Sequence, residues 1–302
     1  MKLEFGTGSR FGRLNFTNAK KIIDYALKLG INRFDTGYTY GNFKSQPLLG
    51  RCLKKEILDF REGLCLSTKC AAISEEYIEY SINQSIESLN CKFIDNFHLW
   101  GPTLYQLENK NILKKLKHLK QKGLINKISV NTHDINIIKK ISKGYFDEIE
   151  GIMVDYNLLQ QDRKKYLSRI KKNNLSVFAG TVLCQGLLIE SIFKTYLRTF
   201  SPFYLGRILL QKEKRRFIDP AKILRKYIQT NYKDSFKKIP LSFILNEDCV
   251  DYIPMGMLSF SSLDKNIEIT KNPIETKITN KVSKWAKKNC QIKLYLDFIH
   301  LS

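Results

Sequence analysis

The rest of the sequence is organised around one stretch, Gly30-Ile31-Asn32-Arg33-Phe34-Asp35-Thr36-Gly37-Tyr38-Thr39-Tyr40-Gly41. After a glycine that ends a helix, apolar and polar residues alternate as they do at the start of a strand. Asp35 then falls at the end of the predicted strand, and Tyr40 falls in the loop that follows. Because α/β folds carry their chemistry at the carboxyl ends of strands, this ionisable pair is a candidate site. A turn in which Asp35 only caps the next helix is the alternative.

A second strand-like run, Gly63-Leu64-Cys65-Leu66-Ser67-Thr68-Lys69, ends in a lysine. If both strands belong to one parallel sheet, Asp35, Tyr40 and Lys69 converge at the same rim. A lysine ammonium close to a tyrosine favours the phenolate, and a carboxylate holds the lysine in place. These residue types suit a tyrosine that donates a proton during carbonyl reduction.

Strand-like and helical runs alternate along the chain, and this alternation predicts parallel βαβ units. Eight strands argue for a closed (β/α)8 TIM barrel over an open sheet, and no Gly-x-Gly-x-x-Gly motif opens a helix. The predicted strands are residues 2–7, 31–35, 64–68, 94–100, 127–131, 149–154, 176–181 and 250–254. The predicted helices include residues 18–29, 74–89, a stretch ending at Gly123, 161–172 and 276–288.

The length of 302 residues suits a single barrel domain over residues 1–302. An irregular segment at about 189–220, rich in aromatic and basic residues, departs from the alternation. We interpret it as a loop and helix packed on the barrel. A lid over a ligand and a contact surface for a partner or a membrane, through residues 189–217, are the alternatives. A helix and a tail at about 275–302 end the sequence.

The formal charge of +22 comes from 51 basic and 29 acidic residues. Such a surplus attracts nucleic acid or an anionic surface, but most of the lysines lie on predicted helix faces. We therefore expect a solvated surface and no specific nucleic-acid partner. The seven cysteines are scattered and never spaced as Cys-x-x-Cys, which disfavours disulfide and zinc sites. The absence of a long apolar run or a signal-peptide pattern predicts a cytoplasmic protein without a transmembrane segment.

Two of these motifs resemble the aldo-keto reductases. The family's Asp-Thr-Ala-x-x-Tyr-Gly motif is matched from Asp35 to Gly41 with Gly37 in place of the alanine, and its Thr-Lys motif is matched by Thr68-Lys69. The resemblance implies that Tyr40 is the general acid and that Lys69 and Asp35 support it. It also implies NADPH or NADH as cofactor, a small carbonyl substrate and no metal.

The family's fourth catalytic residue is a histidine just before a proline at the end of the fourth strand. Here that position holds Trp100, and His98 lies two residues earlier. Residues two apart share one face of a strand, so His98 is expected about 6–7 Å deeper along it. We expect a buried histidine satisfied by a neighbour, with a catalytic role for His98 as the alternative. Trp100 is expected to line the substrate pocket.

The resemblance extends through the cofactor half of the family's site. It implies nucleotide contacts from Gly8, Ser9, Asp35, Asn131, Thr132, Leu183, Gln185, Gly256 and Asn266. Asn131 and Thr132 replace the Ser-Asn pair that holds the nicotinamide amide, and both can form hydrogen bonds to it. Met153 replaces a frequent glutamine, and Gly180 replaces the aromatic residue that commonly stacks on the nicotinamide.

The family's grip on the 2′-phosphate of NADPH is not evident in this sequence. The basic positions are Gly256 and Ser262 here, so the motif does not favour NADPH over NADH. Lys265 and Arg10 are the candidate substitutes.

The sequence thus predicts an NAD(P)H-dependent oxidoreductase that reduces an aldehyde or ketone, or oxidises the corresponding alcohol. The basic surplus suggests a polar, sugar-like or anionic substrate. A catalytically degenerate barrel that binds a ligand for regulation is the alternative, because it explains Trp100, Met153 and Gly180 together.

Overall fold

The structure of the chain is a computed structural model that describes residues 1–199, 206, 209–211 and 215–290. The chain divides into two compact units. The first comprises residues 1–155, 162–180 and 247–272, and the second comprises residues 156–161, 181–246 and 273–302. The tail from residue 291 and residues 200–205, 207–208 and 212–214 of the irregular segment at 189–220 lie outside the described residues.

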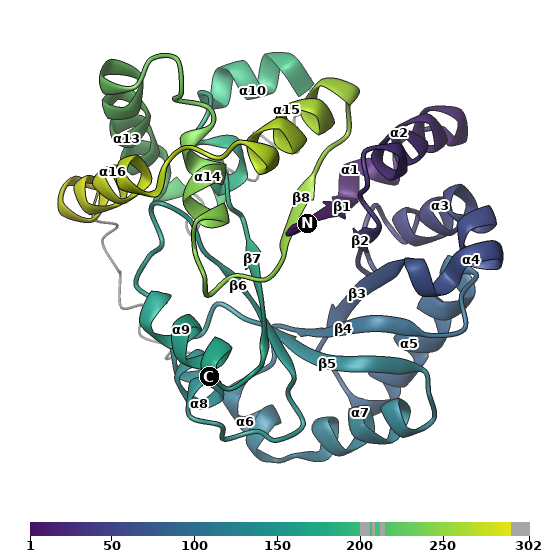
Figure 1. Cartoon of the computed structure of the whole chain (residues 1–302). Coiled ribbons are helices and arrows are strands. Elements are labelled where there is room, and N and C mark those ends of the chain that lie inside the picture. Colours follow the sequence, from purple (N-terminus) through teal and green to yellow (C-terminus); the bar gives the residue numbers. More distant parts are fainter. Residues whose placement is uncertain (200–205, 207–208, 212–214, 291–302) are drawn as a thin grey trace. The chain divides into compact units, whose positions relative to one another are not determined.

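The first unit is a closed barrel of parallel strands. In the described part of the chain, eight strands follow the order β7-β6-β5-β4-β3-β2-β1-β8. A parallel bridge between Phe178 and Tyr252 joins β7 to the residue just before β8, and so connects the two ends of this order. Figure 1 labels the eight strands. The predicted (β/α)8 fold is therefore confirmed. The strands are β1 (Leu3–Gly6), β2 (Arg33–Asp35), β3 (Cys65–Ala71), β4 (Ile94–Trp100), β5 (Ile125–Asn131), β6 (Gly151–Asp155), β7 (Ser176–Gly180) and β8 (Ile253–Gly256).

Helices of this unit begin and end where the sequence provides capping residues. The side chain of Asn15 accepts a hydrogen bond from the Asn18 amide at the start of α2, and Ser74 caps α5 in the same way. Gly30 and Gly123 follow α2 and α7 with φ of +83° and +75°, which side chains rarely allow. The helices are α1 (Gly8–Phe11), α2 (Phe16–Lys28), α3 (Ser45–Cys52), α4 (Lys54–Phe60), η1 (Arg61–Gly63), α5 (Glu75–Leu89), α6 (Leu104–Glu108), α7 (Asn111–Gln121), α8 (Ile135–Ser142), α9 (Lys164–Lys172) and α15 (Phe260–Lys271).

The inside of the barrel is polar along its first four strands. Phe5 of β1 contacts Phe11 of α1, and Thr68 of β3 accepts a hydrogen bond from Gln46 of α3. These two residues, and every second residue from them along each strand, therefore face the helices. The alternate residues face the interior. Barrel interiors are usually filled by branched apolar side chains. Here the interior residues of β1 to β4 include Glu4, Arg33, Asp35, Cys65, Ser67, Lys69, Asn96 and His98.

The second unit is helical in the residues that the structure describes. Its helices are α10 (Ile192–Thr199), α13 (Ile218–Asn231), α14 (Ile239–Leu245) and α16 (Thr276–Asn289), with a short 3-10 helix η2 (Cys184–Gly186). Tyr227 of α13 stacks on Trp285 of α16 with ring centroids 3.7 Å apart. Asn246, at the end of α14, donates hydrogen bonds to Ile274 O and Thr279 Oγ1. These contacts hold α13 and the end of α14 against α16 and the segment before it.

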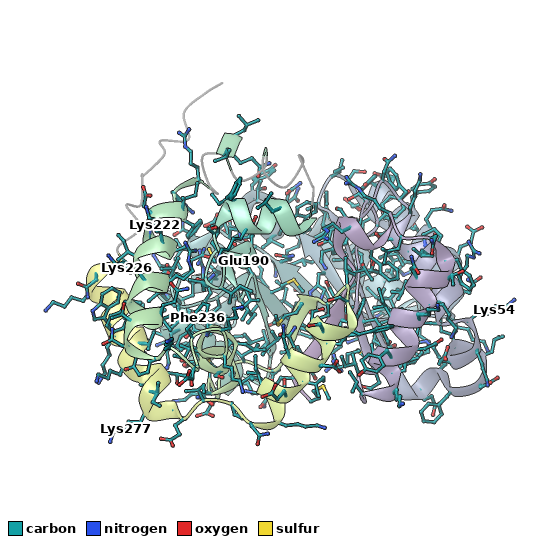
Figure 2. The ribbon with its side chains drawn as sticks, turned by 90° about the horizontal axis from the view of Figure 1, so that it is seen from above. Lys54, Glu190, Lys222, Lys226, Phe236 and Lys277 are labelled. Atoms are coloured by element: carbon teal, nitrogen blue, oxygen red, sulfur yellow. The ribbon has the colours of Figure 1, made fainter. Side chains whose placement is uncertain are left out.

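Lysines lie on the exposed faces of the second unit's helices, as the sequence predicts. Lys222 and Lys226 of α13 and Lys277 of α16 are exposed (Figure 2), and they take no part in the ion pairs found among the described residues. On α10, Phe193 and Leu197 are 67% and 45% exposed, so they are not core residues. No helix in the described ranges has the length and apolar character needed to span a membrane.

Candidate active site

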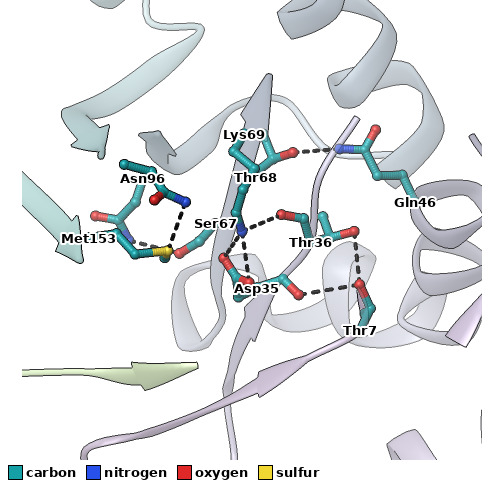
Figure 3. A network of polar contacts seen from close by, with 10 residues as sticks. Thr7, Asp35, Thr36, Gln46, Ser67, Thr68, Lys69, Asn96 and Met153 are labelled. Atoms are coloured by element: carbon teal, nitrogen blue, oxygen red, sulfur yellow. Dashed lines mark hydrogen bonds and ion pairs between the residues drawn. The ribbon is translucent and has the colours of Figure 1, made fainter. Parts of the chain in front are cut away.

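Asp35 and Lys69 form a buried ion pair inside the barrel. Lys69 Nζ lies 2.6 Å and 2.8 Å from the two carboxylate oxygens of Asp35, and it also donates to Thr36 O at 2.8 Å (Figure 3). The two side chains are 7% and 3% exposed. An ammonium has three N–H donors, so these three acceptors satisfy it completely. The sequence prediction that Asp35 and Lys69 meet agrees with this geometry.

Neighbouring strands fix the positions of both residues. Asp35 ends β2, and its register partner on β3 is Ser67, two residues before Lys69. The loop after β2 continues along β3, because Thr36 N donates to Ser67 O and Tyr38 N donates to Lys69 O. On the other side, Thr7 Oγ1 donates to Thr36 Oγ1 at 3.0 Å. The pair therefore sits in a framework of backbone hydrogen bonds.

Burial and the mutual attraction of the pair compete in setting the two pKa values. Burial raises the pKa of the Asp35 carboxyl, and the nearby Lys69 opposes this. Burial alone would lower the pKa of Lys69, but Asp35 and then Tyr40 raise it above its ordinary value. Lys69 is therefore held as an ammonium, and its positive charge is available to the residues around it.

Tyr40 lies next to Lys69 in the loop after β2. Lys69 Nζ is 5.2 Å from the centroid of the Tyr40 ring, and the ring is half-buried. The ring rests on Gly37, where an added Cβ would lie 3.0 Å from two ring carbons and 3.1 Å from a third. Gly37, which replaces an alanine of the family motif, thus lets the ring approach the backbone closely.

We expect Gly37→Ala to lower turnover by about tenfold, because the added methyl group displaces the Tyr40 ring by a few tenths of an ångström relative to Lys69. Steady-state kinetics and thermal unfolding of the variant measure the effect. Thr39→Ala, in the same loop, is the matched control and is expected to behave as the wild type. Full activity of Gly37→Ala in a stable protein would show that the ring position is not critical.

His98 is buried beside the ion pair but differs from the expectation. It is the register partner of Lys69 on β4 and is 0% exposed. Neither ring nitrogen has a hydrogen-bond partner among the described residues, so the expected partner is not found. The ring meets Phe178 edge to face at 4.7 Å. Burial, followed by the charge of Lys69, holds the pKa of His98 well below its usual value, so the ring is neutral.

Trp100 occupies the last position of β4, as the sequence predicts. Its side chain is 42% exposed, and its carbonyl accepts a hydrogen bond from Ala72 N. Residues two apart on a strand point the same way, so Trp100 lies above His98 toward the carboxyl end of the barrel. An exposed indole here provides an apolar surface where the family motif has a histidine.

The expected nicotinamide contacts lie on the neighbouring strand β5. Asn131, the register partner of Trp100, donates through Nδ2 to Met153 Sδ at 3.3 Å. Thr132 is buried, and its hydroxyl oxygen accepts a hydrogen bond from Asp134 N. A thioether is a weak acceptor, so the Asn131 amide is held only lightly in this position.

Other expected nucleotide contacts of the first unit lie after β1, at the end of β8 and on α15. Gly8 begins α1 with φ of +56° and Ser9 follows it, exposed. Gly256 ends β8 and is exposed, and Asn266 lies half-buried on α15. The start of α15 carries a capping box between Ser259 and Ser262, so the Ser262 side chain serves the helix.

Leu183 and Gln185 lie in the second unit, in a loop of unusual backbone conformation. Thr181, Cys184 and Gln185 have φ of +47°, +47° and +57°, a region that non-glycine residues rarely adopt. The buried Asn157 anchors the loop by donating to Thr181 O at 3.1 Å. Strained backbone held in place in this way accompanies binding sites more often than chance. The anchoring role of Asn157 was missed from the sequence.

Other polar residues of the first unit were also missed. Glu4 and Arg33 form an ion pair inside the barrel, with Arg33 Nε 2.9 Å from Glu4 Oε1. His133 Nδ1, two residues after β5, lies 3.1 Å from Oδ2 of Asp155, the last residue of β6. A charged residue between Leu3 and Phe5 was the only sequence signal for the first pair. Among the described residues, no group of three or more His, Cys, Asp and Glu side chains could hold a metal ion.

The chain is similar in sequence to proteins named as an oxidoreductase and a dehydrogenase. The chain is 26% identical over 199 residues to the uncharacterised oxidoreductase YqkF of Bacillus subtilis (strain 168), covering 62% of this chain and 63% of that protein. It is 27% identical over 195 residues to L-galactose dehydrogenase of Arabidopsis thaliana, covering 61% and 60%. These matches thus span less than two thirds of either relative.

Solved structures and a family profile extend the likeness to nearly the whole chain. Aldo-keto reductase AKR11C1 from Bacillus halodurans, in its holo form, gives a TM-score of 0.74 at 23% identity and covers 98% of this chain and 94% of its own. This likeness supports the fold. The profile of the Aldo/keto reductase family matches residues 2–287. Two relatives of this chain are named as an oxidoreductase and a dehydrogenase. The chain therefore belongs to the aldo/keto reductase family.

Proposed function

We propose that the protein is an NAD(P)H-dependent oxidoreductase that reduces an aldehyde or ketone, or oxidises the corresponding alcohol. The observation that carries this proposal is the buried Asp35–Lys69 pair with Tyr40 beside it. Family membership supports the oxidoreductase class. The relative named L-galactose dehydrogenase supports a sugar-like substrate.

In the proposed reaction, Tyr40 donates the proton to the substrate oxygen. The Lys69 ammonium stabilises the negative charge that then develops on the phenol oxygen, and Asp35 keeps Lys69 oriented and charged. The nicotinamide supplies or accepts the hydride when it is bound. Trp100 adds an apolar wall, so substrate orientation depends on Tyr40 more than in relatives with a histidine at this position.

The residues of the first unit fit a nicotinamide nucleotide in part. The Asn131 amide, which in the described part of the chain donates to the weak acceptor Met153 Sδ, can hydrogen-bond to the carboxamide of the nicotinamide. The start of α15, a helix of twelve residues just after β8, provides backbone N–H groups and a positive dipole end for a phosphate. Gly180 provides no aromatic ring to stack on the nicotinamide. Lys265, in the first half of α15, is an exposed cation on the helix whose start is proposed to bind the phosphate. Gly8, Ser9, Gly256 and Asn266 complete the proposed contacts, and Leu183 and Gln185 remain predictions.

Titration of the protein with NADPH and NADH, followed by nicotinamide fluorescence, tests the proposal and selects the cofactor. We expect saturable binding in the micromolar range, followed by oxidation of the reduced cofactor when a carbonyl substrate is added. A catalytically degenerate barrel is the second candidate, favoured by Trp100 and by the Met153 contact of Asn131. If neither NADPH nor NADH binds, the result would support the degenerate barrel and contradict the reductase.

A further inference from the structure

Glu4 and Arg33 form a second charged layer in the barrel interior. Glu4 is 0% exposed, and its Oε1 accepts a hydrogen bond from Arg33 Nε at 2.9 Å. The Arg33 guanidinium lies 3.8 Å from the centre of the Tyr252 ring, which covers it. The other carboxylate oxygen of Glu4 is buried without a hydrogen-bond partner in the described residues. A buried acid with one oxygen unpaired is costly, and its retention calls for an explanation.

The strand register places this layer directly below the Asp35–Lys69 pair. Phe5 pairs with Phe34 and Gly6 pairs with Asp35, so Glu4 stands beside Arg33, two residues before the Asp35 level. Two residues along a strand correspond to about 6–7 Å. Gly6 has no side chain, so no side chain of β1 stands between Glu4 and the level of Asp35.

The charges of the two layers depend on the protonation of Glu4. Arg33 and Asp35 of β2, and Lys69 and Cys65 of β3, are the ionisable groups that face it. Burial raises the pKa of Cys65 to about 12, so this thiol stays neutral. Burial also raises the pKa of Glu4 to about 7; Arg33 and Lys69 oppose this rise, and Asp35 adds to it. The four charged groups therefore sum to zero when Glu4 is ionised and to one positive charge when it is protonated.

We propose that Glu4, held by Arg33, is a positioning residue that sets the net charge beneath Lys69. Through this charge it controls how strongly the site stabilises the negative charge that develops on the substrate oxygen. This inference rests on the proposed carbonyl reduction. A negative charge on Glu4 disfavours the developing alkoxide, so neutral Glu4 gives the faster reduction. Turnover in the reductive direction consequently falls as the pH rises through about 7.

Glu4→Gln separates this role from a structural one, because glutamine keeps the acceptor for Arg33 and removes the ionisation. From pH 6 to pH 8.5 the wild type is expected to lose about fivefold more of its reductive turnover than Glu4→Gln. The matched control is Asp95→Asn. Asp95 pairs with Arg61 at 2.7 Å but has the parity that faces the helices, so its variant is expected to keep the wild-type profile. Parallel profiles of wild type and Glu4→Gln would overturn the proposal.

A double-mutant cycle tests the same coupling without turnover. The free energy of unfolding is measured for wild type, Glu4→Gln, Lys69→Gln and the double variant at pH 5.5 and pH 8.5. A coupling between Glu4 and Lys69 that is larger at pH 8.5 supports the proposal. Equal coupling at both pH values would overturn it. If Lys69→Gln does not fold, Asp35→Asn takes its place; the cycle then measures the repulsion between Glu4 and Asp35, which the proposal likewise expects to be larger at pH 8.5. If the wild type shows no turnover or cofactor binding, the reductase proposal fails, and the cycle still decides whether the charge of Glu4 acts on the Asp35–Lys69 pair.

Discussion

Replacement of Tyr40 by phenylalanine is expected to lower turnover of a carbonyl substrate by about 10²- to 10⁴-fold, the range that a positioned general acid contributes. The change removes the phenol oxygen and leaves the ring. The ring fills the space over Gly37 and beside Lys69, so the loop after β2 keeps its shape. The Asp35–Lys69 pair is complete without Tyr40, because Lys69 already has three acceptors. Nucleotide affinity is therefore expected to stay within about twofold of wild type.

Steady-state turnover and nucleotide titration on the same preparation give the two quantities. Tyr38→Phe is the matched control: its ring lies 5.1 Å from that of Phe43, edge to face, in the same loop. This variant is expected to retain activity. If Tyr40→Phe turns over like the wild type while binding nucleotide, another group supplies the proton, and the assignment of Tyr40 is wrong.

The sequence predicted the barrel because each strand and helix shows its own residue pattern within a short segment, so the alternation of strands and helices can be recognised without knowing the fold. Strand β4 runs from Ile94 to Trp100, the predicted limits, since seven consecutive residues have partners on β3 or β5 or lie between such residues. Strand β3 runs to Ala71, beyond the prediction, because Ala71 pairs with Trp100. Lys69 thus lies within its strand and not at the strand's end, and its long side chain reaches sideways to Asp35. The residue at which a strand ends is decided by its pairing with neighbouring strands, and the sequence of the strand alone does not reveal that pairing.

The candidate site was predictable only where its residues follow a motif. Asp35 and Lys69 each end a short pattern at a recognisable place, so their meeting could be predicted. Glu4 and Arg33 have no such pattern, because a charged residue inside a strand is usually expected to face solvent. Their interior position follows from closure of the barrel, which turns this face of β1 and β2 inward. Among the described residues His98 has no hydrogen-bond partner, and this too depends on which side chains the neighbouring strands place around it.

The polar interior also explains why the site sits where it does in this barrel. Asn96 donates a hydrogen bond to Ser67 Oγ at 3.1 Å at the level of Asp35 (Figure 3). Asn96 also donates to Cys65 Sγ at 3.2 Å. Polar side chains from β2, β3 and β4 therefore surround the ion pair with fixed dipoles. Such an environment keeps two buried charges in place more cheaply than an apolar core does.

Lys69→Met is expected to lower the free energy of unfolding by about 3–5 kcal/mol, because it leaves the buried Asp35 carboxylate without its partner. It also removes the charge that supports Tyr40, so turnover is lost. Without Lys69, burial raises the pKa of Asp35 unopposed. The folded variant then binds a proton that the unfolded chain releases, so its stability falls as pH rises above the ordinary value of 3.8. The deficit relative to wild type is therefore expected to be larger at pH 8 than at pH 5.

Urea denaturation at both pH values, followed by circular dichroism, measures this deficit. Lys115→Met is the matched control, since Lys115 pairs with Glu79 at the surface and its loss is expected to leave stability close to wild type. Adding Asp35→Asn to Lys69→Met removes the unpaired charge and is expected to recover part of the stability and most of the pH dependence. A deficit that is the same at pH 5 and pH 8, or no recovery in the double variant, would mean that the Asp35 carboxylate is not buried as a charge beneath the site. In that case the pair could not hold Lys69 as the ammonium that Tyr40 needs.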